Sequence, residues 1–302
     1  MRAPVVYHPA YVTPLPASHR FPMPKFAHLL AHLRRTGLLL PTQEFVPEPA
    51  PRSWLELAHD SHYVTGVLEQ RLDAAAIRRL GLPLSPVLAL RSRCAVAGTV
   101  LTARLALEHG IACNTAGGSH HAFAGFGAGF CVFNDVAVAA RVLAAEGLIR
   151  RSLVIDLDVH QGDGTAAILA RDPSAFTLSV HCRANFPARK QQSDLDVALD
   201  PGVGDGDYLE VLAGLLPALL DRVRPDIVFY NAGVDPHVDD RLGRLALSDA
   251  GLAERERYLL ALCRSRGLPL ACVVGGGYAD DLDVLAGRHA LLHEAVLALP
   301  AW

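Results

Sequence analysis

The chain has 302 residues, 51% of them apolar, and a net charge of −3 at pH 7. This size supports one large α/β domain or two smaller ones, and the lack of a Ser/Gly-rich linker favours a single domain over residues 1–302. The mixed charges exclude the basic face of a nucleic-acid-binding protein, and no apolar stretch is long enough for a membrane span.

Short apolar segments alternate with longer amphipathic segments along the chain. The short segments are rich in β-branched residues, as is typical of parallel strands buried on both faces: 5–7, 111–113, 153–155, 176–180, 227–230 and 270–274. The longer Ala/Leu/Arg-rich segments predict helices over 94–109, 134–146, 208–222, 252–266 and 283–299. This alternation predicts right-handed βαβ crossovers and a three-layer α/β/α domain with a mostly parallel central sheet.

The cysteines and the first residues indicate the compartment. The six cysteines show no C-x-x-C spacing and lie mostly in apolar segments, which is typical of reduced, buried thiols in a cytosolic protein. His8, Pro9 and Pro14 interrupt what would be the apolar core of a signal peptide. We therefore expect a cytoplasmic protein.

Polar or glycine-rich residues follow five of the predicted strands. Ligands of a parallel α/β sheet bind beyond the carboxyl ends of its strands, so we expect these segments to form one site. They are 114–121, 156–163, His181, 231–235 and 275–278.

The strand at 153–155 leads directly into Asp156, Asp158 and His160. Side chains alternate between the two faces of a strand, so these three would project to one side. Two carboxylates and an imidazole at the end of a buried strand suit a divalent metal ion with an open coordination position. The alternative is a solvated loop in which the acids stabilise turns and cap helices.

Asp235 is the candidate for a metal ligand from a distant strand. It follows the strand at 227–230, and Gly233 permits a tight turn before it. Together with Asp158 and His160 it would bind one divalent cation and leave room for water and a substrate oxygen. Alternatively, Asp235 is a helix N-cap, because proline is favoured at the first helical position that follows.

His120 and His121 follow a sharp Gly-Gly-Ser loop. Adjacent side chains on non-helical backbone point in different directions, so each imidazole needs its own partner, and Asp156 and Asp163 are available to orient them. One histidine could act as general base on the attacking water and the other as an acid or electrostatic partner. Alternatively, the two histidines are exposed polar residues or ligands of a second metal ion.

Glycine-rich loops supply the remaining candidates. The segment Gly275-Gly276-Gly277-Tyr278 lets the backbone approach a ligand and presents a phenol that could stabilise an oxyanion, although glycine runs also form plain turns. Phe130 and Phe186 lie on loops where they could line a narrow apolar tube or take part in ordinary packing.

Taken together, these motifs resemble the zinc-dependent histone deacetylases of the arginase/deacetylase fold and their bacterial relatives. The resemblance runs from about residue 7 to residue 285. It is strongest for the class IV branch, on the motifs His19-Arg20-Phe21-Pro22-Met23, Asp158-Val159-His160-Gln161-Gly162 and Asp239-Asp240-Arg241-Leu242-Gly243.

The resemblance implies a role for each candidate residue. One Zn²⁺ per chain would be held by Asp158, His160 and Asp235. The catalytic groups would be His120, His121, their carboxylate partners Asp156 and Asp163, and the carbonyl-polarising Tyr278. The acyl-lysine tunnel would be lined by Gly129, Phe130, Phe186 and Gly276. A structural K⁺ would be held by Asp156, Asp158, His160, Ser179 and Val180.

Two positions depart from the family pattern. Gln161 stands where many relatives have a second histidine, but this position is not a metal ligand. Class I and II enzymes grip the substrate backbone with an aspartate at the rim of the tunnel, whereas no acidic residue occurs here between Asp73 and Glu108. The sequence therefore does not indicate how a histone-like peptide would be held.

We therefore expect a metal-dependent amidohydrolase that removes an acetyl or longer acyl group from the ε-amino group of acyl-lysine. The candidate residues leave open the acyl-chain length, the oligomeric state and the choice between Zn²⁺ and Fe²⁺. Three alternatives remain: a deacylase of small acylated amines or polyamines, a binuclear-manganese ureohydrolase and a non-catalytic acyl-amine-binding protein. The ureohydrolase needs more bridging carboxylates than the single acid at Asp235 provides.

Overall fold

The computed structural model describes residues 2–16 and 18–300. Its strands are β1 (Val5–Val6), β2 (Glu44–Phe45), β3 (Ile111–Asn114), β4 (Ser152–Asp156), β5 (Ala175–Cys182), β6 (Leu195–Leu199), β7 (Ile227–Asn231) and β8 (Leu270–Val273). They form one eight-stranded sheet in the order β2-β1-β3-β8-β7-β4-β5-β6. Every neighbouring pair in this sheet is parallel.

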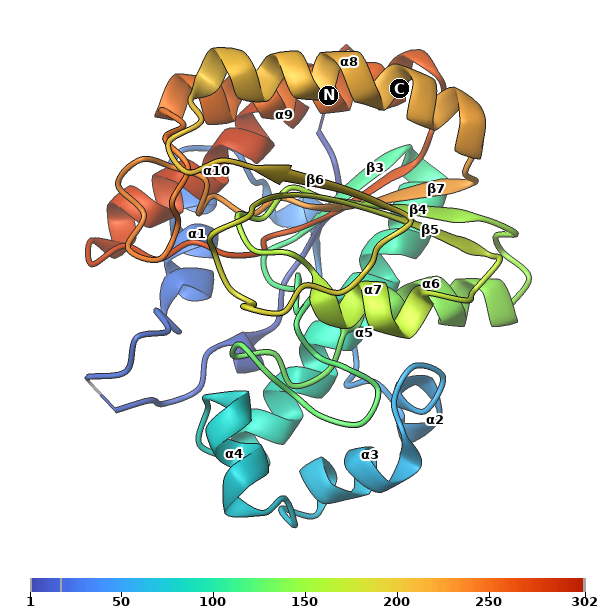
Figure 1. Ribbon diagram of the computed structural model, residues 1–302, viewed down its shortest axis with the longest axis vertical. Helices are drawn as coiled ribbons and strands as arrows, with labels where there is room; N and C mark the ends of the chain where they lie inside the picture. The colour runs from blue at the N-terminus through green and yellow to red at the C-terminus, as the bar shows by residue number, and fades with distance from the viewer. Residues whose placement is uncertain (1, 17, 301–302) are drawn as a thin grey trace.

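Helices cover both faces of the sheet, so the three-layer α/β/α prediction is confirmed (Figure 1). The helices are α1 (Lys25–Arg35), α2 (Arg52–Leu55), α3 (Ser61–Leu68), α4 (Ala74–Leu80), α5 (Pro86–His109), α6 (Asp135–Ala145), α7 (Asp163–Leu169), α8 (Asp205–Val223), α9 (Asp249–Ser265) and α10 (Leu282–Ala298), with 3-10 turns η1 (Pro9–Tyr11) and η2 (Pro41–Gln43). Helices α8, α9 and α10 lie on one side of the sheet and α5, α6 and α7 on the other, with α2, α3 and α4 beyond them (Figure 1). Helix α1 packs against α10.

All six predicted strands form, because their apolar side chains are buried in the centre of the sheet. In β4 and β7 every residue is buried. The two strands that the pattern missed, β2 and β6, lie at the two edges of the sheet. Their residues are mostly half-buried, so they do not form an apolar run in the sequence.

The five predicted helices also form, and α5 begins earlier than expected. Ser85 caps this helix by accepting a hydrogen bond of 3.1 Å from the N–H of Leu88, and Pro86 occupies the first helical turn. The short helices α2, α3, α4 and α7 and the histidine-rich α1 were not predicted. The six cysteines are free and buried, as expected. Within the described residues, no helix combines the length and apolar content that crossing a membrane requires.

Candidate active site

Asp158, His160 and Asp235 form a buried group beyond the carboxyl ends of β4 and β7. One candidate ligand atom from each residue lies within 4.8 Å of the others. The His160 Nδ1 atom is 3.0 Å from Asp158 Oδ1 and 3.1 Å from Asp235 Oδ2. Burial, together with the neighbouring Asp158 carboxylate, raises the pKa of Asp235. A bound cation would therefore stabilise the ionised forms of these two buried carboxylates. An imidazole and two carboxylates fit a divalent ion of the zinc type.

The strand alternation expected for Asp156, Asp158 and His160 is wrong, because β4 ends at Asp156. The following residues form bends that fold the backbone around the carboxylates. The N–H of Asp158 donates to Asp156 Oδ1 at 3.2 Å, and the N–H of His160 donates to Asp158 Oδ1 at 2.9 Å. The Asp156 carboxylate therefore faces His120, and only Asp158 and His160 face Asp235.

Two backbone donors from other loops hold the carboxylates in place. The N–H of Gly276 donates to Asp158 Oδ2 at 2.7 Å, and the N–H of Val159 donates to Asp235 Oδ1 at 2.9 Å. No helix follows Asp235, so it is not an N-cap. Gly276 was expected in the tunnel wall, but it lies against the two carboxylates, where a Cβ atom would overlap both. Gly276 allows the backbone to approach the carboxylates of Asp158 and Asp235 closely.

Each histidine of the adjacent pair lies against its own aspartate. His120 Nδ1 is 2.7 Å from Asp156 Oδ2, and His121 Nδ1 is 2.6 Å from Asp163 Oδ1. The centres of the two imidazole rings are 4.1 Å apart, and both side chains are buried. The carboxylates therefore orient two neighbouring imidazoles at the carboxyl edge of the sheet.

The electrostatic environment separates the protonation of the two histidines. Burial opposes a charge on His120, but the carboxylates of Asp156 and Asp158 outweigh it and raise the pKa of His120 to about 9. Burial and the neighbouring charge of His120 lower the pKa of His121 to about 4. Without a metal ion, these opposite shifts favour a charged His120 beside a neutral His121 near neutral pH. A divalent cation beside Asp158 would offset part of its charge and lower the pKa of His120.

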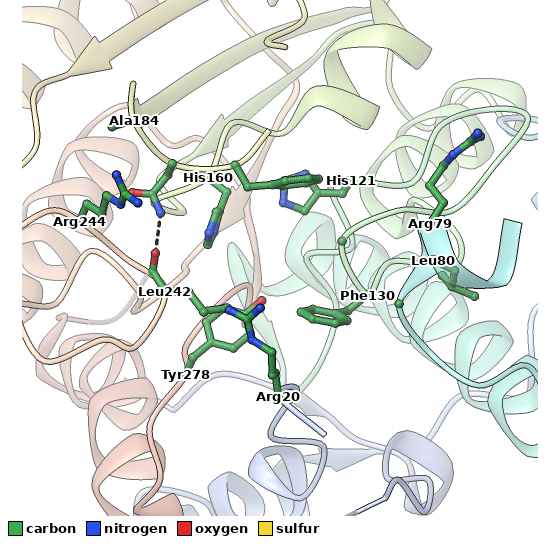
Figure 2. A pocket seen from close by; sticks show the side chains of 14 residues that line it. Arg20, Arg79, Leu80, His121, Phe130, His160, Ala184, Leu242, Arg244 and Tyr278 are labelled. Atoms are coloured by element: carbon green, nitrogen blue, oxygen red, sulfur yellow. Dashed lines mark hydrogen bonds between the residues drawn. The ribbon is translucent and has the colours of Figure 1, made fainter. Parts of the chain in front are cut away.

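A pocket with a volume of about 380 Å³ opens onto this group (Figure 2). It is lined by Arg20, Arg79, Leu80, Gly81, His121, Gly129, Phe130, His160, Ala184, Asn185, Phe186, Leu242, Arg244 and Tyr278. His121, His160 and Tyr278 face the same space as Phe130 (Figure 2). The pocket thus combines proton-transfer groups with an apolar wall.

Tyr278 presents a protonated hydroxyl to this pocket. Burial, followed by the charges of Asp235 and Asp158, raises its pKa well above the ordinary value of 10.0. Tyr278 is 9% exposed, and its backbone N–H donates to Asp240 Oδ2 at 2.7 Å, which fixes the end of the glycine loop. A neutral phenol at this place can donate a hydrogen bond to a developing oxyanion.

Two phenylalanines form part of the pocket wall. Phe186 packs edge-on against His121 with ring centres 4.8 Å apart. Phe130 has a φ of 68° and follows Gly129, whose φ is 54°. A Cβ atom at Gly129 would lie 2.6 Å from His121 Cδ2, so only glycine lets this loop run so close to the imidazole.

Several residues of the site escaped the sequence analysis. Asn231 donates to Asp156 Oδ1 at 2.9 Å from its side chain, and the buried Arg255 donates to Gly233 O at 2.8 Å. The Phe21 ring packs behind the pocket wall, with its centre 5.4 Å from the centre of the Phe130 ring. Lys25 is buried next to Tyr278. Asn231 was within a segment expected to contribute, whereas Arg255 and Lys25 lie inside helices and carry no local signal.

The residues expected to hold K⁺ come from adjacent parts of the sheet. Asp156 and Ser179 are register partners on β4 and β5, and Val180 follows Ser179. Ser179 Oγ lies 3.0 Å from His181 Nδ1. The potassium site remains a prediction.

Comparison with known families identifies the class to which this fold and site belong. Residues 19–292 match the family model described as the histone deacetylase domain. The chain therefore belongs to the histone deacetylase family, whose members are generally metal-dependent, and it is a hydrolase that acts on amides.

Individual relatives agree with this assignment. An uncharacterized protein of Picosynechococcus sp. is 55% identical over 98% of each chain. Histone deacetylase 2 of Arabidopsis thaliana is 29% identical over 86% of this chain and 70% of its own length. A probable deacetylase of Methanothermobacter thermautotrophicus is 32% identical over 63% of this chain and 60% of its own.

A solved structure shows the same fold. The crystal structure of the HDA15 HD domain matches with a TM-score of 0.83 at 22% sequence identity, over 98% of this chain and 91% of that chain. This likeness confirms the predicted deacetylase-like architecture.

Proposed function

We propose that the protein is a zinc-dependent deacylase that hydrolyses the amide between an acyl group and the ε-amino group of lysine. The observation that supports it most directly is the pocket in which His121, His160 and Tyr278 share one space with Phe130 and Phe186. An apolar wall suits the methylene chain of lysine, and the polar groups lie where its acylated end would reach.

Asp158, His160 and Asp235 would hold the metal ion. When bound, a zinc ion supplies Lewis-acid chemistry, which polarises a carbonyl and lowers the pKa of a water molecule. This proposal includes one Zn²⁺ per chain and a structural K⁺ beside Asp156. The proposal also includes membership of the class IV branch, which rests on the sequence motifs. It includes a cytoplasmic location as well, which rests on the free cysteines.

The histidine pair would carry the proton transfers. Asp163 holds Nδ1 of the neutral His121, so its other nitrogen is the basic one and accepts a proton from the attacking water. His121 lines the pocket, whereas His120 lies behind it against Asp156. The charged His120 would stabilise the negative charge that develops during attack.

The Tyr278 hydroxyl would donate a hydrogen bond to the oxygen of the tetrahedral carbon. The carbon–nitrogen bond then breaks, and the proton taken from water passes to the departing nitrogen. One water molecule and one amide give one carboxylate and one protonated amine.

The test is a panel of acyl-lysine peptides, with acetyl and longer chains, and acylated small amines, assayed with and without a zinc chelator. We expect chelator-sensitive release of the acyl group as a carboxylate, which leaves an unmodified lysine side chain or amine. His121→Ala and Tyr278→Phe should each lose activity, Tyr278→Phe by about 10²–10³ in kcat. The control is Tyr258→Phe, which removes the hydroxyl group of a tyrosine on α9 that does not line the pocket.

Other outcomes would favour the alternatives. Unchanged deacylation by His121→Ala and Tyr278→Phe would refute the mechanism. Two tightly bound manganese ions per chain with turnover of a guanidinium substrate would indicate a ureohydrolase. Tight binding of acylated amines without turnover would indicate a binding protein.

A further inference from the structure

Three arginines surround the mouth of the pocket. Arg20 precedes α1, Arg79 lies in α4, and Arg244 lies in the loop between β7 and α9. They come from different sides of the pocket, around His121 and His160 (Figure 2). All three residues are exposed, so their guanidinium groups are available to a bound molecule.

Carboxylates of the described chain do not neutralise these arginines. No ion pair joins Arg20, Arg79 or Arg244 to an acid among the residues that the structure describes, whereas the nearby Arg241 pairs with Asp280. Arg79 stacks on the ring of Phe126 at 4.6 Å, which orients its guanidinium without cancelling its charge.

The lining of the pocket contains no acidic residue among the described residues. The segment between Asp73 and Glu108, which has no acid at all, contributes Arg79, Leu80 and Gly81 to the lining. A further cation lies behind the part of the wall that contains Asn185, where Lys190 Nζ donates to the carbonyl oxygens of Asn185 and Pro187 at 2.6 Å each. The potential at the mouth is therefore positive on several sides.

We propose that the substrate carries carboxylates beside the acylated amine, and that Arg20, Arg79 and Arg244 bind them. The inference rests on the proposed deacylase function, and it narrows the substrate class. With the acyl group at the metal end, the remainder of the molecule emerges between the arginines. A polyamine would place positive charge there and be repelled. Acyl-lysine with a free α-carboxylate, or within an acidic peptide, would be attracted.

The test compares blocked pentapeptides in which one acyl-lysine is flanked by Glu, Gln or Lys on both sides. All carry the acyl group that gives the highest kcat/KM in the Gln peptide. A second arm compares Nα-blocked acyl-lysine with its methylamide and with acylated spermidine, which separates the α-carboxylate from acidic neighbours. We expect kcat/KM to be at least about tenfold higher for the Glu peptide than for the Lys peptide at low salt, since each exposed pair is worth roughly two- to fivefold.

Changes in ionic strength and in the arginines test whether these arginines cause the preference for the Glu peptide. Raising ionic strength from 0.1 M to 1 M shortens the screening length from about 10 Å to about 3 Å and should shrink the Glu/Lys ratio. The triple variant Arg20→Gln, Arg79→Gln, Arg244→Gln should bring the ratio close to one. Arg78→Gln is the control, because Arg78 is an exposed neighbour on α4 that does not line the pocket. It should keep the wild-type ratio.

A Glu/Lys ratio within twofold at low salt would overturn this inference and leave the proposed deacylase function intact. Faster turnover of acylated spermidine, with acyl-lysine still hydrolysed, would do the same. Binding of fluorescein-labelled versions of the peptides to Tyr278→Phe gives a readout without turnover. Stronger binding of the Glu peptide, with no hydrolysis of any peptide by the metal-loaded enzyme, would refute the proposed function while supporting the charge preference.

Discussion

The ammonium group of Lys25 donates a hydrogen bond of 2.9 Å to the carbonyl oxygen of Gly275, 250 residues further along the chain. The same Nζ atom lies 5.7 Å from the centre of the Tyr278 ring. Burial lowers the pKa of Lys25 to about 8, against the opposing effect of the Asp235 and Asp158 carboxylates. A buried cation on α1 therefore holds the glycine loop that ends in the proposed oxyanion donor.

Replacing this cation should impair the reaction more than the fold. In Lys25→Met the Gly275 carbonyl loses its buried donor, which costs about 1–3 kcal/mol, and the loop is free to shift. We expect kcat/KM to fall on the order of 10- to 100-fold, as small displacements of catalytic groups do. Lys25→Arg keeps the positive charge and should retain more activity. Wild-type kcat/KM in Lys25→Met, measured beside its thermal unfolding, would rule out this positioning role.

Substitution of a proposed metal ligand should have opposite effects on metal binding and on metal-free stability. Asp235 is fully buried, and its pKa is raised by burial and by Asp158, so its ionised form destabilises the fold when no cation is bound. We expect Asp235→Asn to lose metal, as measured by elemental analysis. At pH 8 with chelator, it should be at least as stable as wild type. Metal should raise the melting temperature of wild type but not of the variant.

Two glycines with similar backbone conformations should respond differently to alanine. Gly129 and Gly147 have φ of 54° and 71°, so alanine is strained at both, by about 1 kcal/mol. A Cβ atom at Gly129 meets His121 Cδ2 at 2.6 Å, whereas one at Gly147 meets nothing within 4 Å. Gly129→Ala should therefore lower kcat/KM at least tenfold, and Gly147→Ala should lower stability only. Equal activity of the two variants would show that a Cβ atom at Gly129 does not disturb His121.

His59 should make stability depend on acid. Its Nε2 atom accepts the N–H of Asn134 and its Nδ1 atom lies beside the carbonyl of Phe123, both at 2.9 Å, and burial lowers its pKa to about 4. Because the folded pKa lies below the unfolded value of 6.5, this stabilisation is complete above pH 6.5 and is lost as pH falls toward 4.

The measurement is urea unfolding of wild type and His59→Gln at pH 7.5 and pH 4.5. Wild type should lose roughly 2 kcal/mol more than the variant between these values. His62→Gln, which removes an exposed histidine of α3, serves as the control and should follow wild type. Parallel losses in wild type and His59→Gln would show that folding does not lower the pKa of His59.

Some of the fold could be predicted because its signals are local. Strands such as β4 and β7 are buried on both faces, so their burial appears in the sequence as an apolar run. The edge strands β2 and β6 are stabilised by neighbours on one side only, and their polar residues gave no such run. The start of α5 depended on the Ser85 cap, which the apolar pattern does not contain.

The residue types of the site were determined by the sequence alone: an Asp-x-Asp-x-His motif after a buried strand, a histidine pair and a tyrosine after three glycines. Tertiary structure decided which atoms meet. The bend after Asp156 sends that carboxylate to His120 and leaves Asp158 to join Asp235. Lys25 contacts the glycine loop from α1, and the three mouth arginines reach the pocket from three separate segments of the chain. Side-chain identity is local, but convergence depends on strand order and loop bends, which periodicity does not encode.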